Sequence, residues 1–133
     1  MEESPGKRAV LEYVAAFNAG DMERLRLLHT DDAQVHGVLG WGGMDKVIPI
    51  WTMLHETLSI ELHVEEIVEQ GDVVAVRYTE RGRSAGDWRG QPATGKTYAV
   101  DAMEWFHIRD GRIHRRWGAR DSAAIFRQLE LQP

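Results

Sequence analysis

The last third of the chain places a carboxylate directly behind two strand-like segments. Residues 96–108 form an apolar strand candidate, Asp110-Gly111 supplies a tight turn, and residues 112–120 lead to Asp121. This order places an acid at the mouth of a sheet, and a carboxylic acid in an apolar site is suited to proton transfer. Asp121 also precedes Ser122-Ala123-Ala124, a helix start at which Asp is a preferred N-cap. Both roles are open, and they can coexist.

Histidines are the other candidate proton carriers. His107 lies near the end of the strand that pairs with the one leading to Asp121, although an ordinary hydrogen-bonded histidine explains it as well. No two histidines have H-x-H or H-E-x-x-H spacing, and there is no cysteine, so we expect neither a zinc site nor thiol chemistry. Four histidines are expected at the periphery: His29, His55, His63 and His114.

One sequence motif matches a phosphate-binding pattern but lacks the secondary structure that this pattern requires. Residues 90–97 read G-Q-P-A-T-G-K-T and match G-x-x-x-x-G-K-T. That pattern holds phosphates where a strand precedes it and a helix follows it, because the helix N-terminus supplies backbone amides. Here the following residues alternate as a strand, so we expect no nucleotide binding.

The overall charge and hydropathy narrow the classes of molecule that the protein is expected to bind. The 133 residues carry a formal net charge of −5 and no Lys/Arg run, which argues against a nucleic-acid surface. No apolar run approaches a membrane span, and the N-terminus lacks the core of a signal peptide. We expect one soluble, cytoplasmic domain over residues 1–133.

Helical signals come first along the chain. Ser4-Pro5 begins a helix that Asn18-Ala19-Gly20 ends, and Asp21 can cap a second helix. A-Q-V-H-G-V at 33–38 is a short strand candidate that runs into a glycine-rich loop. A third helix tolerates Pro49 only near its first turn. Its apolar stripe is Val47, Trp51, Leu54 and Leu58.

From Ser59 the apolar period changes from helical to two, as in a sheet with one solvated face. Gly71-Asp72 is a turn, and Gly82–Gly95 is too rich in glycine for regular structure. The strand candidates are 60–65, 73–81, 96–108 and 112–120. Helices followed by strands and a closing helix predict an α+β fold with a curved, mostly antiparallel sheet and helices on one face.

These segments together resemble the SnoaL-like polyketide cyclases, a branch of the nuclear-transport-factor-2-like superfamily. The resemblance covers nearly everything from Val10 to Leu129. It is carried by Y-V-A-A-F-N-A-G-D at 13–21, A-Q-V-H at 33–36, P-A-T-G-K at 92–96, D-G-R-I-H-R-R-W-G-A-R-D ending at Asp121, and R-Q-L at 127–129. It implies a cone-shaped, mixed or antiparallel sheet whose concave face carries the helices.

The resemblance also implies a chemistry. The open end of the cone is a deep apolar pocket walled by the concave sheet face and the first and third helices. Asp121 takes the place of the general acid/base for an intramolecular aldol closure of a polyketide ester, which needs no metal or other cofactor. His36, on a strand bordering the cavity, and His107 are expected to assist, with an ordinary histidine as the alternative for each.

Aromatic residues are candidates for the pocket wall. Among five tryptophans, Trp51 is the expected core member, whereas Trp41 and Trp88 lie among glycines in loops. If no bulge intervenes, alternation places Arg115 and Asp121 on one strand face, and Arg115 then needs an acid such as Glu104. The expected substrate-binding residues are Tyr13, Trp41, Trp88, Met103, Glu104 and Trp117.

Other functions within the superfamily stay open. Ketosteroid isomerases have a tyrosine where Tyr13 stands and an acid at Glu104, but their base aligns with Gly37. Epoxide hydrolases use Arg-x-Asp, where this chain reads Arg81-Gly82-Arg83. A non-catalytic module would bind a hydrophobic small molecule or dimerise through the outer sheet face. We expect a homodimer, with a candidate patch at Val74, Val76 and Tyr78.

Overall fold

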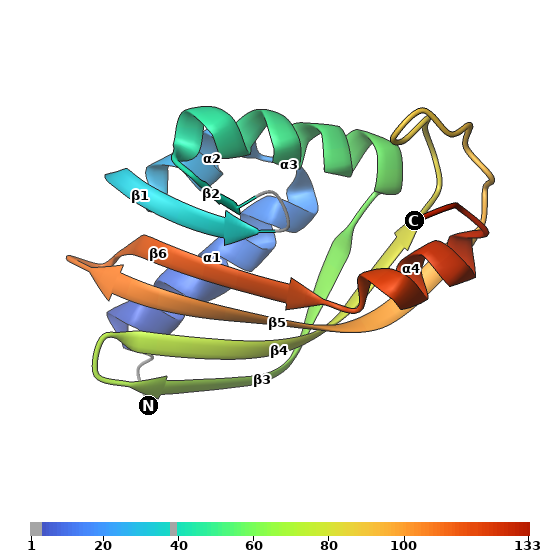
Figure 1. Ribbon diagram of the computed structural model, residues 1–133. Helices are drawn as coiled ribbons and strands as arrows, with labels where there is room; N and C mark the ends of the chain where they lie inside the picture. The colour runs from blue at the N-terminus through green and yellow to red at the C-terminus, as the bar shows by residue number, and fades with distance from the viewer. Residues whose placement is uncertain (1–3, 38–39) are drawn as a thin grey trace.

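A curved six-stranded sheet and the helices packed against it form the body of the protein (Figure 1). The computed structural model describes residues 4–37 and 40–133. The order of helices, strands and a closing helix is the predicted α+β order. The elements are α1 (Pro5–Ala19), α2 (Met22–Leu27), β1 (His29–Gly37), β2 (Gly40–Gly42), α3 (Met44–Leu58), β3 (Glu61–Gln70), β4 (Val73–Arg83), β5 (Thr97–Arg109), β6 (Arg112–Arg120) and α4 (Ser122–Leu129).

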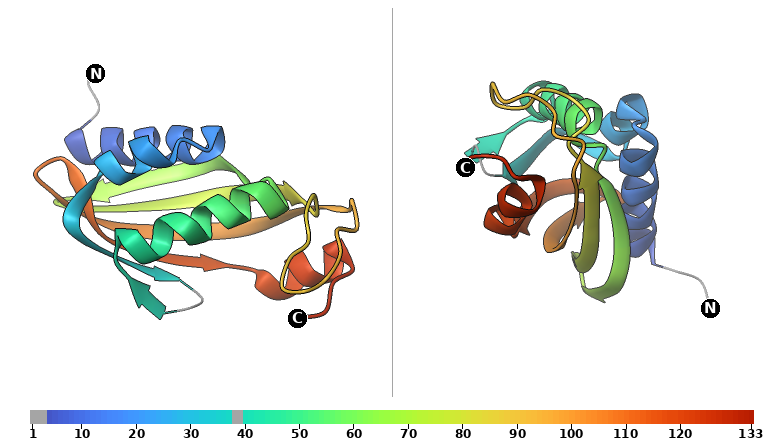
Figure 2. Two further views of the ribbon diagram at one scale, coloured as in Figure 1. Left: turned by 90° about the horizontal axis from the view of Figure 1, so that it is seen from above. Right: turned by 90° about the vertical axis from the view of Figure 1, so that its right-hand side faces the viewer.

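The sheet has the strand order β2-β1-β6-β5-β4-β3. Because β1 and β6 run parallel while the other neighbours are antiparallel, the sheet is mixed. α1 and α3 cover its concave face, and α4 packs beside β5 (Figure 2). The predicted cone with helices on the concave face is confirmed. None of the helices in the described ranges is long and apolar enough to cross a membrane.

Local signals explain the helix ends. The Ser4 hydroxyl accepts a hydrogen bond from the Lys7 amide at 3.2 Å, and Pro5 occupies the first turn of α1. Gly20 ends that helix with a φ of 70°, which a residue without Cβ adopts at little cost. Asp21 caps α2 as predicted. Pro49 lies inside α3, deeper than the expected first turn, since that helix begins at Met44.

The region between α2 and α3 differs from its prediction. β1 begins at His29, ahead of the expected start at Ala33. The glycine-rich segment that was expected to be a loop contains β2, which pairs with the end of β1. Val38, the expected last residue of the first strand, lies outside the described residues. Glycine weakens a strand without preventing it, and here the neighbouring β1 supplies the hydrogen bonds.

Strand alternation decides which side chains reach the concave face. On β4, Val74, Val76, Tyr78 and Glu80 are buried beneath the helices, while the residues between them face outward. The expected dimerisation patch at Val74, Val76 and Tyr78 is therefore wrong, because these side chains belong to the core. The open face of the sheet is formed by the opposite set of side chains.

Candidate active site

A cavity of about 280 Å³ lies between the concave sheet face, α1 and α3, as the resemblance implied. Trp51 lines it and is buried, in agreement with its predicted core position. Most of the wall is apolar. The helix side chains that contribute are Tyr13, Phe17, Lys46, Val47, Ile50, Trp51 and Leu54. A largely apolar cavity of this kind suits a small hydrophobic molecule.

A buried ion pair stands on the cavity wall. Glu104 of β5 and Arg116 of β6 are joined by a 3.0 Å contact between Oε2 and Nη1, and both side chains are about nine-tenths buried. The Tyr13 hydroxyl donates to the same Oε2 at 3.2 Å. The Arg116 guanidinium also packs over the Trp51 ring, 5.6 Å from its centroid. Two neighbours, Tyr13 and Trp51, therefore hold the ion pair in one orientation.

Several polar atoms of this cluster have no partner. Glu104 Oε1, Arg116 Nε and the Tyr78 hydroxyl are buried and make no hydrogen bond within the described residues. A buried polar group without a partner costs about 1–3 kcal/mol. All three residues line the cavity, so these buried groups lie close to any molecule that enters it.

The tyrosines and the arginine of this cluster keep their protons and can donate hydrogen bonds. Burial, followed by the negative charge of Glu104, raises the pKa of Tyr13 and of Tyr78 well above the ordinary value. Both hydroxyls therefore keep their protons and act as donors. Burial lowers the pKa of Arg116, but Glu104, Tyr13 and Tyr78 together outweigh it and the net shift is upward, so the guanidinium stays charged.

A second ion pair lines the cavity further along the sheet. Arg120 of β6 contacts Glu80 of β4, and the Tyr98 hydroxyl donates to the same carboxylate oxygen. Burial and the Glu80 charge raise the pKa of Tyr98, so this hydroxyl also remains a donor. Lys46 lies at an exposed position of the wall and donates to the Trp41 carbonyl at 3.2 Å.

A β-bulge determines which arginine enters the cavity. His107 pairs with Arg115, but the next residue, Ile108, pairs with Ile113, so the register shifts within β6. Arg116 therefore faces inward beside Glu104, and Arg115 does not. The expectation of uninterrupted alternation through this strand is wrong, although an acid–arginine pair at Glu104 is present.

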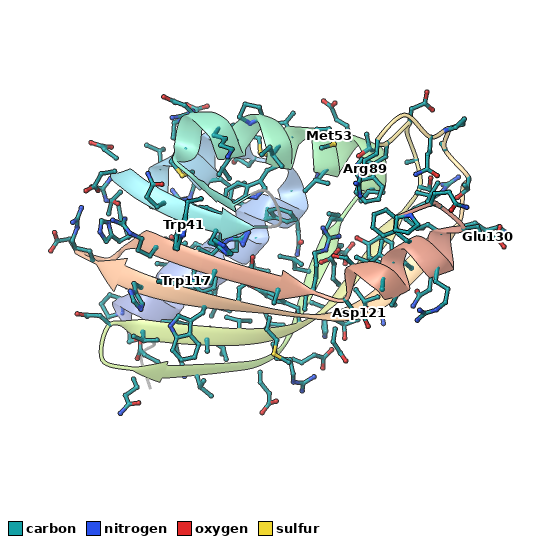
Figure 3. All side chains as sticks on the ribbon, in the orientation of Figure 1. Trp41, Met53, Arg89, Trp117, Asp121 and Glu130 are labelled. Carbon is teal, nitrogen blue, oxygen red and sulfur yellow. The ribbon has the colours of Figure 1, made fainter. Side chains whose placement is uncertain are left out.

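Both candidate histidines lie on the outer face of the sheet. His36 is paired with Trp41 across β1 and β2, with ring centroids 5.0 Å apart, and His107 lies 4.8 Å from the Trp117 ring. The two tryptophans contact each other edge to face at 5.3 Å, on the near side of the molecule in Figure 3. The structure joins these four residues but places none of them on the cavity wall.

Asp121 lies at the junction of β6 and α4, away from this aromatic cluster (Figure 3). Its carboxylate accepts a 3.0 Å hydrogen bond from the Ala124 amide, and the residue is exposed. Asp121 is thus the N-cap of α4 and does not line the cavity. Trp88 also lies off the wall, stacked on Phe126 at 5.2 Å.

Some of the predicted substrate-binding residues line the cavity, and the others lie elsewhere. Tyr13 and Glu104 line the cavity together. Met103 borders it but is 55% exposed and points to the outer face with Trp117. Trp41 and Trp88 contribute to other clusters. The sequence prediction thus identified one pair of the cavity's polar side chains.

A family model for SnoaL-like polyketide cyclases matches residues 7–129. This chain belongs to the SnoaL-like polyketide cyclase family. Among named relatives, the aklanonic acid methyl ester cyclase DnrD of Streptomyces peucetius is 37% identical to the SnoaL-like chain over 82 residues, 59% of this chain and 55% of the relative. The corresponding AcmA of Streptomyces galilaeus is 33% identical over 76 residues, 56% and 53% of the two chains. The matches thus span about half the length of these relatives.

Solved structures agree with the fold. IdmH of Streptomyces antibioticus superimposes on the SnoaL-like chain with a TM-score of 0.84 at 26% identity, over 97% of this chain and all of the other. A SnoaL-like protein from Jannaschia sp. CCS1 gives 0.87 at 21% identity, covering 100% and 99%. The second comparison bears on the fold alone. Together they confirm the cone of the nuclear-transport-factor-2-like superfamily.

Sequence reasoning missed five polar residues of this SnoaL-like cavity: Tyr78, Glu80, Arg116, Arg120 and Lys46. A signal for the first two was present, because both continue the alternation that starts at Val74. A glutamate in the inward register of an otherwise apolar strand indicates a buried ion pair. No comparable signal marks Arg116, since the bulge that turns it inward has no glycine or other local signature.

The cap at Asp121 gives a stability prediction for the SnoaL-like protein. Asp121→Ala removes the acceptor for the Ala124 amide, so we expect the free energy of unfolding to fall by about 1 kcal/mol. Asp121→Asn keeps a good cap and should change it by less than about 0.5 kcal/mol. Urea denaturation measures both. Equal losses in the two variants would show that the charge, and not the cap, is what stabilises α4.

Proposed function

We propose that this protein is a cofactor-free cyclase that closes a ring by intramolecular aldol-type chemistry on a hydrophobic, carbonyl-containing molecule of the polyketide type. The observation that carries the proposal is the apolar cavity with a buried, ionised cluster and unpartnered donors on its wall. Membership of the SnoaL-like family and the names of the aklanonic acid methyl ester cyclases support it.

The chemistry needs only groups of this kind. A carboxylate takes a proton from a carbon between two carbonyls, and buried donors stabilise the enolate oxygen. The carbanion then attacks a second carbonyl of the same molecule, and the proton returns to the new alkoxide. Substrate and ring-closed product are isomers at this step, so no oxidant or reductant enters.

Turnover of a substrate panel tests the proposal. The panel contains polyketide esters, β-dicarbonyls, enone steroids and epoxides, each assayed by product analysis. We expect a β-dicarbonyl or polyketide ester to cyclise. Isomerisation of an enone steroid or opening of an epoxide, without any cyclisation, would instead place this protein with the isomerases or hydrolases of the superfamily.

The resemblance to the family predicts Asp121 as the acid/base, assisted by His36 and His107, and a variant of Asp121 tests that prediction. Since all three lie off the cavity wall, we expect Asp121→Asn to keep kcat/KM within about threefold of the wild type. The asparagine preserves the cap, so the comparison isolates the acid. A loss of about two orders of magnitude or more would establish Asp121 as the acid/base.

A non-catalytic binding module is the second candidate, because Asp121 caps a helix in the exposed position that such a module would tolerate. In that case hydrophobic panel members bind without turnover. Trp51 lines the cavity, so quenching of its fluorescence reports binding. Binding of a β-dicarbonyl with no product under any condition would favour this module over the cyclase.

We also propose that two copies pair through the outer sheet face. Exposed apolar side chains gather there on β3 and β5, where Val68, Met103 and Trp105 are 61%, 55% and 50% exposed. Contiguous apolar surface of this kind commonly marks an interface, and a two-fold axis lets one patch cover its own copy.

Sedimentation equilibrium tests the pairing. We expect a dimer for the wild type and a shift of at least about tenfold towards monomer for Trp105→Glu, because a charge would be buried at the interface. Leu27→Glu is the matched control: Leu27 is 63% exposed but belongs to α2. A monomeric wild type at all concentrations, or equal effects of the two variants, would contradict the proposal.

A further inference from the structure

We propose that Glu104 is the base of the reaction, with its free Oε1 as the atom that takes the proton, and that the Tyr78 hydroxyl stabilises the enolate oxygen. This inference rests on the proposed function and identifies the atom that acts as the base in that reaction. It differs from the prediction at Asp121, which the structure places at a helix cap.

The choice of carboxylate follows from the cavity wall. Glu80 and Glu104 are the carboxylates among the described residues that line it. The Glu80 Oε2 accepts hydrogen bonds from both Tyr98 and Arg120, and neither Glu80 oxygen is buried without a hydrogen-bond partner. Glu104 has such an oxygen, Oε1. The unfilled acceptor therefore belongs to Glu104.

The partners of Glu104 leave one of its oxygens without a hydrogen bond. Arg116 and Tyr13 both bond Oε2, at 3.0 and 3.2 Å, and thereby hold the carboxylate plane. An ion-paired carboxylate is in its charged form, so it accepts a proton. In the isomerases, by contrast, an acid at this place is useful as a protonated donor, which requires an apolar site without a cationic partner.

Tyr78 is placed to complete the step. Its strand partner is Ala102, while Glu104 pairs with Val76, so Tyr78 and Glu104 are diagonal neighbours on the concave face. The hydroxyl is buried next to Glu104, and burial, then the charge and side-chain oxygens of Glu104, raise the pKa of Tyr78, yet no hydrogen bond of ordinary geometry joins the two. A donor held beside the base is in place for an oxyanion that develops there.

The proton balance closes within the site. Glu104 Oε1 removes the proton from the carbon between two carbonyls, and the C–H electron pair becomes the enolate. Tyr78 donates a hydrogen bond to the enolate oxygen without transferring its proton. When the carbanion attacks the second carbonyl, a C–C bond forms and the C=O π electrons move to oxygen. The proton on Glu104 then passes to that alkoxide, which restores the carboxylate.

Hydrogen–deuterium exchange tests the base apart from ring closure. The probe is a long-chain alkyl 3-oxo ester that has no further carbonyl and cannot cyclise. Its chain length is chosen so that tryptophan quenching shows it bound, and NMR follows loss of its C2 proton in D₂O. We expect the wild type to accelerate exchange above the buffer rate, and Glu104→Gln to lose about 100-fold or more of that acceleration.

Tyr78→Phe provides a second test, because its hydroxyl has no partner and its loss should leave folding intact. We expect exchange to fall about tenfold or more. Asp101→Asn, which changes an outward carboxylate on the same strand, should exchange at the wild-type rate. Circular dichroism and probe quenching confirm that each variant is folded and binds.

The outcomes separate the base from the proposed function. Bound probe that exchanges no faster than in buffer, or a folded Glu104→Gln protein within about threefold of wild type, would overturn the assignment of Glu104. Exchange that depends on Glu104 without cyclisation of any panel member would support Glu104 as a base and contradict the cyclase function. Cyclisation that survives Glu104→Gln would support the cyclase function and contradict Glu104 as its base.

Discussion

Arg116→Met should lower the free energy of unfolding by about 3–5 kcal/mol. The Arg116 side chain is about nine-tenths buried, and its guanidinium contacts Glu104 at 3.0 Å. Its removal leaves the Glu104 carboxylate charged and buried, with only the Tyr13 hydroxyl to compensate it. Since domains of this size are stable by about 5–15 kcal/mol, the loss is a large part of the total. Urea denaturation followed by tryptophan fluorescence gives the value.

The double variant Glu104→Met/Arg116→Met is the control for this prediction. It removes both charges and replaces them with apolar side chains of similar length, so it should recover most of the lost stability. A double variant as unstable as the single one would mean that packing over Trp51, and not the uncompensated charge, explains the loss. The coupling between the two sites is therefore the decisive quantity.

Element order was predictable because its signals are local. Ser4 and Asp21 mark helix starts through side-chain oxygens that bond amides within the same turn, and Gly20 marks a helix end. Turns at Gly71 and Gly111 adopt positive φ, which glycine tolerates. The alternation of β4 and β5 follows directly from burial of one sheet face. These features need no knowledge of distant contacts.

Face assignment was less predictable, because it depends on tertiary contacts. The alternation on β4 groups Val74, Val76 and Tyr78 correctly, but the pattern alone does not say whether that group faces the helices or the outside. On β6 one register shift exchanges Arg115 for Arg116 at the cavity wall. A one-residue slip moves every following side chain to the opposite face.

The same limit applies to the site. The cap at Asp121, one of the two roles that the sequence left open, is a local role and is present, whereas the resemblance carried the catalytic role over from the family. His36 and His107 were placed at the cavity from the strands that carry them, and both strands border it, but their side chains point outward. A strand's membership of the site does not identify which of its faces contributes.

His29 was expected at the periphery and is buried instead. It starts β1 directly after α2, and its Nδ1 lies 2.6 Å from the Leu25 carbonyl, while its ring contacts those of Tyr13 and Trp51. Nε2 is buried without a partner in the described chain. Burial, with a contribution from Arg116, lowers the pKa of His29 from 6.5 to about 4, although the Leu25 carbonyl opposes the shift.

This buried imidazole predicts an acid-sensitive fold. The folded pKa lies below the unfolded one, so the unfolded chain takes up the proton first as the pH falls. The stabilisation is complete above pH 6.5 and is lost progressively towards pH 4. Each unit of pKa difference corresponds to about 1.4 kcal/mol. We therefore expect the free energy of unfolding to drop by about 2–3 kcal/mol between pH 7 and pH 4.5, as measured by urea denaturation across this range.

His29→Phe isolates the effect, because it keeps an aromatic ring among Tyr13 and Trp51 and removes the titrating group. It should cost some stability at pH 7 through the lost contact with the Leu25 carbonyl, yet it should flatten the pH dependence above pH 4.5. His63→Gln, at an exposed position on β3, should keep the wild-type slope. A slope unchanged by His29→Phe would assign the acid sensitivity to other groups. A flattened slope would show that a histidine at the start of β1 couples protonation to the packing behind the cavity wall.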